Sequence, residues 1–137
     1  MDNALLLPLL IQIWLTFIIA LMTLKTRIKS AKRGEVKLAY FKHNQGNAPE
    51  KMLRLDDNLK NQFELPILFY TIILLLLLLQ QNSLMYLIMA WIFVISRIIH
   101  AYIHIKTNHI RHRMMSFLAG FITLMLMWLS LSVELLM

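Results

Sequence analysis

The chain contains no cysteine, and only three glycines and three prolines occur among its 137 residues. The missing thiol excludes disulfides, thiolate catalysis by the protein and cysteine-ligated metal sites. Acidic residues are also scarce: seven stand against fourteen lysines and arginines, which gives a formal net charge of +7. Most of the rest is apolar, since 59% of the residues are hydrophobic. A soluble domain of this composition would lack the polar residues that cover a core.

Four apolar stretches each approach the ~20 residues that a helix needs to cross a bilayer. They cover residues 4–25, 61–80, 84–104 and 114–133. Each is expected to be helical, because hydrocarbon cannot form hydrogen bonds with an open backbone. The sequence therefore predicts an all-α integral membrane four-helix bundle. We expect one domain over residues 1–137, with a basic loop at residues 26–60.

Basic residues are distributed unevenly over the connections. Ten of the fourteen lie within Lys25–Lys60, and three more lie within Lys106–Arg113. The connection Gln80–Ser83 has none, and neither do the ends of the chain. By the positive-inside rule, the two basic connections are cytoplasmic and both termini lie on the opposite side. The basic loop lacks interleaved aromatic residues, so we expect it to contact anionic lipid and not nucleic acid.

The second and third apolar stretches form an antiparallel hairpin that brings polar residues to one depth. At ~1.5 Å per residue, Glu64 lies about 24 Å from the turn and Arg97 about 21 Å. His100 and His104 follow Arg97 at i+3 and i+7, on the same helix face. Asn61 precedes Glu64 by three residues, also on one face. Since ionisable residues inside a membrane usually have a partner and mark a site, we predict a Glu64–Arg97 pair within this polar cluster.

The start of the second helix has two interpretations. Asn61 and Glu64 have the spacing of a capping box, in which the side chains bond to backbone N–H groups. Pro66 would then fall where the helix needs an N–H. If the helix instead starts near Asp56 or Asp57, Pro66 becomes an interior kink and exposes a backbone carbonyl beside Glu64.

The polar cluster has a purely structural interpretation as well, in which Glu64 and Arg97 only join two helices. Two histidines on the same face are more than such a joint requires. His100 and His104, at i and i+4, have a spacing that suits zinc with Glu64 as a third ligand. Arg97 would repel a cation there, so we predict no metal site.

Two segments, Asn61–Pro66 (NQFELP) and Arg97–His100 (RIIH), resemble the MAPEG family, the membrane-associated proteins of eicosanoid and glutathione metabolism. The similarity extends over roughly residues 54–120 and is to a divergent, bacterial-type member. Arg97 and Arg113 have the spacing found in the prostaglandin E synthase of this family. The resemblance implies a homotrimer of four-helix bundles, with glutathione as co-substrate bound between subunits in the cytoplasmic half of the membrane.

The resemblance also implies roles for individual residues. Arg113 would be catalytic and would stabilise the glutathione thiolate that attacks a lipophilic electrophile. The remaining residues would bind glutathione, with cations for its two carboxylates and an acid for its ammonium. They are Asn61, Glu64, Arg97, His100, His104, Lys60 and Arg27.

Three positions depart from the family pattern. His104 replaces a tyrosine of the catalytic members, His100 is a tyrosine in leukotriene C synthase, and Asp57 replaces a frequent arginine. The leading hypothesis is a glutathione-dependent transferase or peroxidase acting on lipophilic electrophiles, and whether the chain is an enzyme stays open. The alternatives are a non-catalytic lipid-binding or scaffold protein and, after it, a small transporter or proton-relay protein. Expected partners are further copies of the chain, membrane lipids and a lipophilic small molecule.

Overall fold

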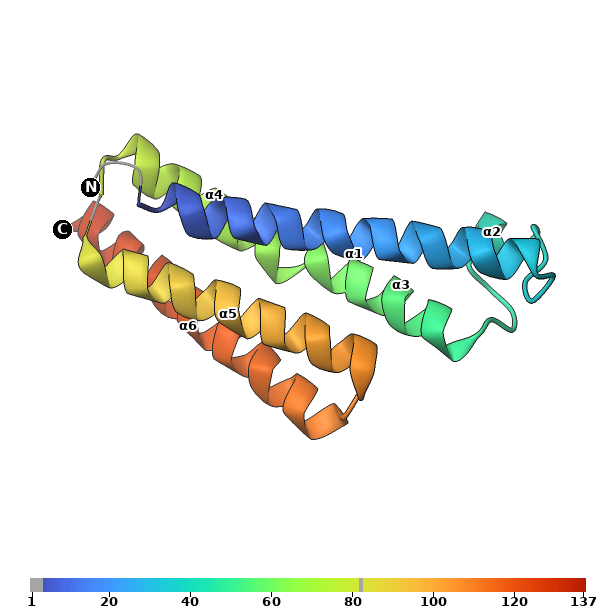
Figure 1. Ribbon diagram of the computed structural model, residues 1–137. Helices are drawn as coiled ribbons and strands as arrows, with labels where there is room; N and C mark the ends of the chain where they lie inside the picture. The colour runs from blue at the N-terminus through green and yellow to red at the C-terminus, as the bar shows by residue number, and fades with distance from the viewer. Residues whose placement is uncertain (1–3, 82) are drawn as a thin grey trace.

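The computed structural model describes residues 4–81 and 83–137, and all the regular structure in these residues is helical (Figure 1). The helices are α1 (Leu6–Lys32), α2 (Tyr40–His43), α3 (Glu50–Gln62), α4 (Leu65–Leu78), α5 (Leu84–Lys106) and α6 (Ile110–Leu136). Four stretches of the described chain are long and apolar enough to cross a membrane: α1, α3 together with α4, α5, and α6. The predicted all-α, four-helix membrane fold is therefore confirmed.

The basic connection at residues 26–60 is largely helical: the first helix extends into it, as its sequence allows, and the part predicted to be irregular also contains helix. α1 continues to Lys32, and α3 already begins at Glu50. Gly34, with φ 70°, takes the left-handed conformation that commonly ends a helix, and Pro49 stands directly before α3. In Figure 1, α1 and α3 lie side by side and extend beyond the turn between α5 and α6. We call this end of the bundle the basic end.

The second membrane crossing is broken between α3 and α4. Phe63 and Glu64 lie between the two helices, and Pro66 is the second residue of α4, where a helix has no use for the N–H that proline lacks. The capping-box interpretation is wrong, because Asn61 lies inside α3 and Glu64 is the N-cap of α4 without a side-chain cap bond. The alternative of a start near Asp56 or Asp57 is closer, but α3 begins still earlier, at Glu50, and the helix breaks before the proline instead of bending around it.

Aromatic and aliphatic side chains form the core between the helices. Phe69 of α4 stacks on Phe93 of α5, with ring centroids 4.4 Å apart, and both are fully buried. On the outside, large apolar side chains stay exposed: Trp14 is 63% and Leu21 65% accessible. An apolar exterior of this extent is expected of a protein surrounded by lipid and not by water.

α5 and α6 form the most extensive helix pair of the bundle and approach closely at Gly120. A Cβ atom added at Gly120 would lie 2.6 Å from Ser96 Oγ. Small residues at such a point let two helix backbones come together, as is common between membrane helices. Gly120 is therefore required by packing and not by backbone conformation.

We predict that Gly120→Ala destabilises the bundle by about 1–3 kcal/mol, because the added methyl group overpacks against Ser96 Oγ. Thermal unfolding in detergent measures the loss. Ser96→Ala removes the hydroxyl, so the double variant should regain most of the stability. Additive losses in the double variant would contradict the proposed contact.

Three buried amides connect α1, α3 and α5 through a chain of hydrogen bonds. Gln12 Nε2 donates to Gln62 Oε1 at 3.1 Å, and Gln62 Nε2 donates to Asn58 Oδ1 at 3.4 Å. Asn58 Nδ2 in turn donates to the carbonyl oxygen of Ala101 at 3.2 Å. None of the three side chains has exposed surface. The chain of amides therefore fixes α3 between its neighbours next to the break.

Replacing Gln62 with methionine keeps the side-chain length but leaves the Gln12 and Asn58 amides buried without this partner. We expect Gln62→Met to lower the free energy of unfolding by about 1–3 kcal/mol. Denaturation in detergent measures it against Gln45→Met, a matched change at an exposed position. Equal stability of the two variants would show that the amide chain contributes nothing.

Candidate functional site

The polar face of α5 is buried inside the bundle, as its spacing predicts. The exposed fractions of Arg97, His100 and His104 are 0%, 3% and 2%. Both histidines contact Arg113 of α6, which shows that this face points toward α6. Three residues able to carry positive charge thus lie within a membrane-spanning helix, which is rare outside functional sites.

Arg113 of α6 joins the two histidines of α5. Its carbonyl oxygen lies 2.9 Å from His100 Nδ1, and its Nη1 lies 3.3 Å from His104 Nε2. Because a guanidinium only donates, His104 accepts through Nε2. Nη1 also donates to Oδ1 of Asn108 at 2.7 Å, and Asn108 is a turn residue with φ 50°. The guanidinium of Arg113 is therefore held in one orientation by two neighbours.

A cavity of about 270 Å³ opens beside Arg113. Its lining residues are Asn61, His100, Ile110, Arg113, Met114 and Phe117. Three predicted site residues from three helices, Asn61, His100 and Arg113, thus face one space. We call it the Arg113 cavity. Guanidinium, imidazole and amide groups can together bind an anion such as a carboxylate or a thiolate.

Arg97 has no hydrogen-bond partner in the part of the chain that the structure describes. Its guanidinium lies 5.6 Å from the ring centroid of Phe117, but none of its three nitrogen atoms makes a hydrogen bond. Glu64, the partner that the sequence predicts, is exposed and forms no ion pair with Arg97. The predicted pair is therefore not formed, because the helix break leaves Glu64 at the surface. A buried cation without a hydrogen-bond partner is costly.

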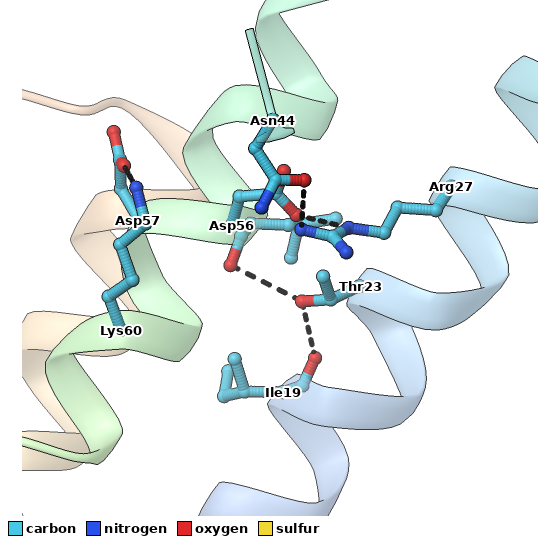
Figure 2. Close-up of polar contacts among 8 residues, drawn as sticks. Ile19, Thr23, Arg27, Asn44, Asp56, Asp57 and Lys60 are labelled. Atoms are coloured by element: carbon cyan, nitrogen blue, oxygen red, sulfur yellow. Dashed lines mark hydrogen bonds and ion pairs between the residues drawn. The ribbon is translucent and has the colours of Figure 1, made fainter. Parts of the chain in front are cut away.

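Lys60 and Arg27 do not line the Arg113 cavity. Lys60 Nζ pairs with Asp57 Oδ1 at 3.1 Å on the exposed surface of α3. Arg27 Nε of α1 pairs with the buried Asp56 Oδ1 at 2.8 Å. Figure 2 shows the two neighbouring carboxylates pointing apart, one toward α1 and the other toward Lys60. Lys60 therefore forms an ion pair on the surface of α3, and Arg27 forms one between α1 and α3.

Three residues that the sequence analysis missed complete the site: Asn108, Ser116 and Phe117. Ser116 Oγ donates to the carbonyl oxygen of Arg113 at 2.9 Å and lies 3.4 Å from His100 Nδ1. Ser116 and Phe117 follow Arg113 at i+3 and i+4, so helical spacing could have identified both. Nothing in the sequence singles out Asn108, whose role depends on the shape of the turn.

The described residues show no group of three or more histidine, aspartate or glutamate side chains arranged to hold a metal ion. The rings of His100 and His104 lie 5.8 Å apart, centroid to centroid. Nδ1 of His100 contacts the carbonyl oxygen of Arg113, and Nε2 of His104 contacts its guanidinium.

Comparison with curated proteins and with solved structures finds no match. The family model of the MAPEG family matches residues 5–133. This match includes all four apolar crossings, the break before Pro66 and the whole Arg113 cavity. The protein with this buried polar face and these four membrane helices belongs to the MAPEG family.

Proposed function

We propose that the protein is a glutathione-dependent transferase or peroxidase acting on a lipophilic electrophile, with its thiol site in the Arg113 cavity. The observation that carries this proposal is the fixed guanidinium of Arg113, which lines a cavity inside a membrane-embedded bundle. A nearby cation favours a thiolate over a thiol, and the thiolate is the nucleophile. Family membership supports glutathione as the source of that thiol.

The chemistry would proceed at the sulfur atom of glutathione. In a transferase, the thiolate forms a bond to an electrophilic carbon of the lipophilic substrate, while the bond from that carbon to its leaving group breaks and the leaving group takes the electron pair. In a peroxidase, it attacks the O–O bond of a hydroperoxide, and a second glutathione completes the reaction to a disulfide, an alcohol and water. In both cases Arg113 would bind the negative charge of the sulfur before attack.

A homotrimer is the assembly that we propose for the complete site. One chain offers a cavity of about 270 Å³, below the ~300–1,000 Å³ of most small-molecule sites. Among the described residues, the buried guanidinium of Arg97 likewise makes no hydrogen bond and no ion pair. Asn61, Arg97, His100, His104 and Arg113 would bind glutathione from one copy. Other predicted ligands would approach from the copy beside it.

Those other predicted ligands lie nearer the surface of the chain. Glu64 and Lys60 are exposed, and Arg27 is partly exposed beside Asp56. The basic end of the bundle would face the cytoplasm, in agreement with the positive-inside rule. Glutathione would then enter from the aqueous side at the first turn of α6.

A non-catalytic lipid-binding protein is the second candidate. The observation that favours it is that Nη1 of Arg113 already donates to Asn108 and His104. A guanidinium satisfied within the protein is less available to a thiolate. In this case the fold would be retained and the thiol chemistry lost.

Glutathione binding tests the proposed site directly. Calorimetry on the detergent-purified protein should show saturable binding that weakens about tenfold or more in Arg113→Ala, since a charge-assisted hydrogen bond contributes ~1.5–3 kcal/mol. Arg111→Ala is the matched control, because Arg111 is exposed and does not line the cavity. Equally weakened glutathione binding in both variants would mean that the overall positive charge of the protein, and not Arg113, is responsible. If the folded protein binds no glutathione, the lipid-binding candidate is favoured.

Turnover tests the role of the cation at the sulfur. With glutathione and an activated aryl halide, Arg113→Gln should lower kcat strongly at neutral pH, since the thiol would ionise without help. The rate should recover in part at higher pH, where solution alone ionises the thiol. A uniform loss at every pH would contradict a role in forming the thiolate.

A further inference from the structure

A further cavity, of about 210 Å³, lies at the basic end of the bundle, between the last turns of α1 and the first turn of α3. α1 contributes four polar residues that share one helix face, at i, i+3, i+4 and i+7: Thr26, Lys29, Ser30 and Arg33. α3 contributes its N-cap, Pro49, and the second residue of the helix, Lys51. We call this space the α1–α3 pocket. Its lining residues differ from those of the Arg113 cavity.

The α1–α3 pocket lies outside the hydrocarbon of the membrane. Lys29 follows Leu6, the first residue of α1, by 23 residues, or about 35 Å along the helix axis. The hydrocarbon core of a bilayer is ~30 Å thick. In Figure 1, this end of α1 extends past the turn between α5 and α6. Lipid head groups and dissolved compounds, and not acyl chains, therefore reach the pocket.

Contacts between α1 and α3 hold the two walls of the pocket in place. The hydroxyl of Thr23 donates to the carbonyl oxygen of Leu55 at 3.2 Å (Figure 2). Beyond the end of α1, the chain turns back, and Val36 and Tyr40 pack with Met52 of α3 in a small buried core. The pocket is therefore built on packed helices and not on a loop alone.

The side chain of Ser30 points to a ligand in this pocket. Thr23, seven residues earlier on the same face of α1, is also buried, and its hydroxyl donates to carbonyl oxygens of Ile19 and Leu55. Ser30 is 4% exposed and lines the pocket, but its hydroxyl makes no hydrogen bond with the described residues. Only its carbonyl oxygen is engaged, by the N–H of Glu35 at 3.0 Å. The hydroxyl can therefore bond with what the pocket holds.

Positive charge surrounds the hydroxyl of Ser30. Three cations line the pocket, Lys29, Arg33 and Lys51, against one carboxylate, that of Glu35, so its net charge is +2. The N-cap of α3 is a proline, which forms no side-chain cap bond, so N–H groups in the first turn of α3 are left for another acceptor. A helix N-terminus with such groups favours an anion.

The last carbonyl groups of α1 would repel an anion, but they are already occupied. Those of Lys29, Ser30 and Ala31 accept the N–H groups of the residues that follow them at i+4, i+5 and i+3. The closing turn, in which Gly34 has φ 70°, makes these bonds possible. The donors of the pocket therefore outnumber its acceptors.

We propose that the α1–α3 pocket binds a phosphate monoester, with the hydroxyl of Ser30, the three cations and the N-terminus of α3 as its donors. A phosphate monoester carries about −1.5 to −2 charges at neutral pH and three acceptor oxygens, which matches a net charge of +2. A phosphodiester carries a smaller charge and has fewer unesterified oxygens. The monoester can belong to a lipid head group or to a dissolved compound. This inference does not depend on the proposed thiol chemistry.

Two measurements on the full chain test the proposal and separate the two sources. In nanodiscs of phosphatidylcholine, calorimetry follows titration with glycerol phosphate at an ionic strength held constant with sodium chloride. In nanodiscs that contain equal amounts of phosphatidic acid and phosphatidylglycerol, native mass spectrometry identifies the lipid retained by the protein. Saturable binding of glycerol phosphate supports a dissolved ligand, and at least fivefold preference for phosphatidic acid supports a lipid head group. If the folded protein shows neither, the proposal is wrong.

Two double variants of α1 remove the same charge from different places. Lys29→Gln with Arg33→Gln should weaken binding at least tenfold, since both side chains line the pocket. Lys25→Gln with Lys32→Gln changes exposed positions outside the pocket and should leave the affinity within twofold. All four positions are exposed, so we expect both proteins to fold, which gel filtration confirms. Equal weakening by the two pairs would overturn the proposal.

Two single variants should change the affinity in opposite directions. Ser30→Ala removes the buried donor and should weaken binding about tenfold. Glu35→Gln removes the carboxylate that repels a phosphate and should strengthen binding several-fold. An unchanged affinity in both variants would place the anion elsewhere on the basic end. No glutathione is present, so failure here is distinct from failure of the proposed thiol site.

Discussion

Hydrocarbon offers no hydrogen bonds, so every polar group inside this bundle must find its partner within the protein or in a bound molecule. The amides of Gln12, Gln62 and Asn58 meet part of this demand by bonding to one another and to the carbonyl oxygen of Ala101, while Gln12 Oε1 has no partner among the described residues. The guanidinium of Arg113 finds its hydrogen-bond partners in His104 and Asn108. Arg97 has no hydrogen-bond partner among the described residues, which is why a second molecule, ligand or subunit, is central to the proposed function.

The break between α3 and α4 decides which polar residues reach the interior. Up to Gln62, α3 presents its amides inward, and Asn61 reaches the Arg113 cavity. After the break, Glu64 lies at the surface and α4 continues as an apolar helix. A single helix through this region would give Glu64 a different position. The break thus separates an inward polar segment from an outward acid within a few residues.

Much of the fold could be predicted from hydropathy and the distribution of charge. Four crossings follow from the lengths of the apolar stretches, and the buried face of Arg97, His100 and His104 follows from helical periodicity. The Glu64–Arg97 pair could not be judged in this way, because the depth estimate assumed an unbroken second helix. Asn58 lay outside the predicted span, and its bond to the carbonyl of Ala101 depends on tertiary packing.

An apolar groove between α5 and α6 was equally hidden from the sequence, because it arises only when Ser116 and Ala119 of α6 face isoleucines of α5 such as Ile95 and Ile99. Periodicity identifies a face of one helix, but not the residues that it meets on another. The hydropathy pattern therefore does not say which helix faces pack together, and this is why neither the groove nor the surroundings of Arg97 could be predicted.

The position of the Arg113 cavity determines in which phase, water or membrane, the concentration of a ligand sets its occupancy. The cavity lies at the first turns of α6, at the basic end, while the groove beside it lies along apolar helix surface. A water-soluble molecule and a membrane-dissolved one would therefore reach neighbouring places from two different solvents. The occupancy of the first follows its molarity in the aqueous phase. The occupancy of the second follows its mole fraction among the lipids, so extra membrane dilutes it even when the total amount in the sample is unchanged.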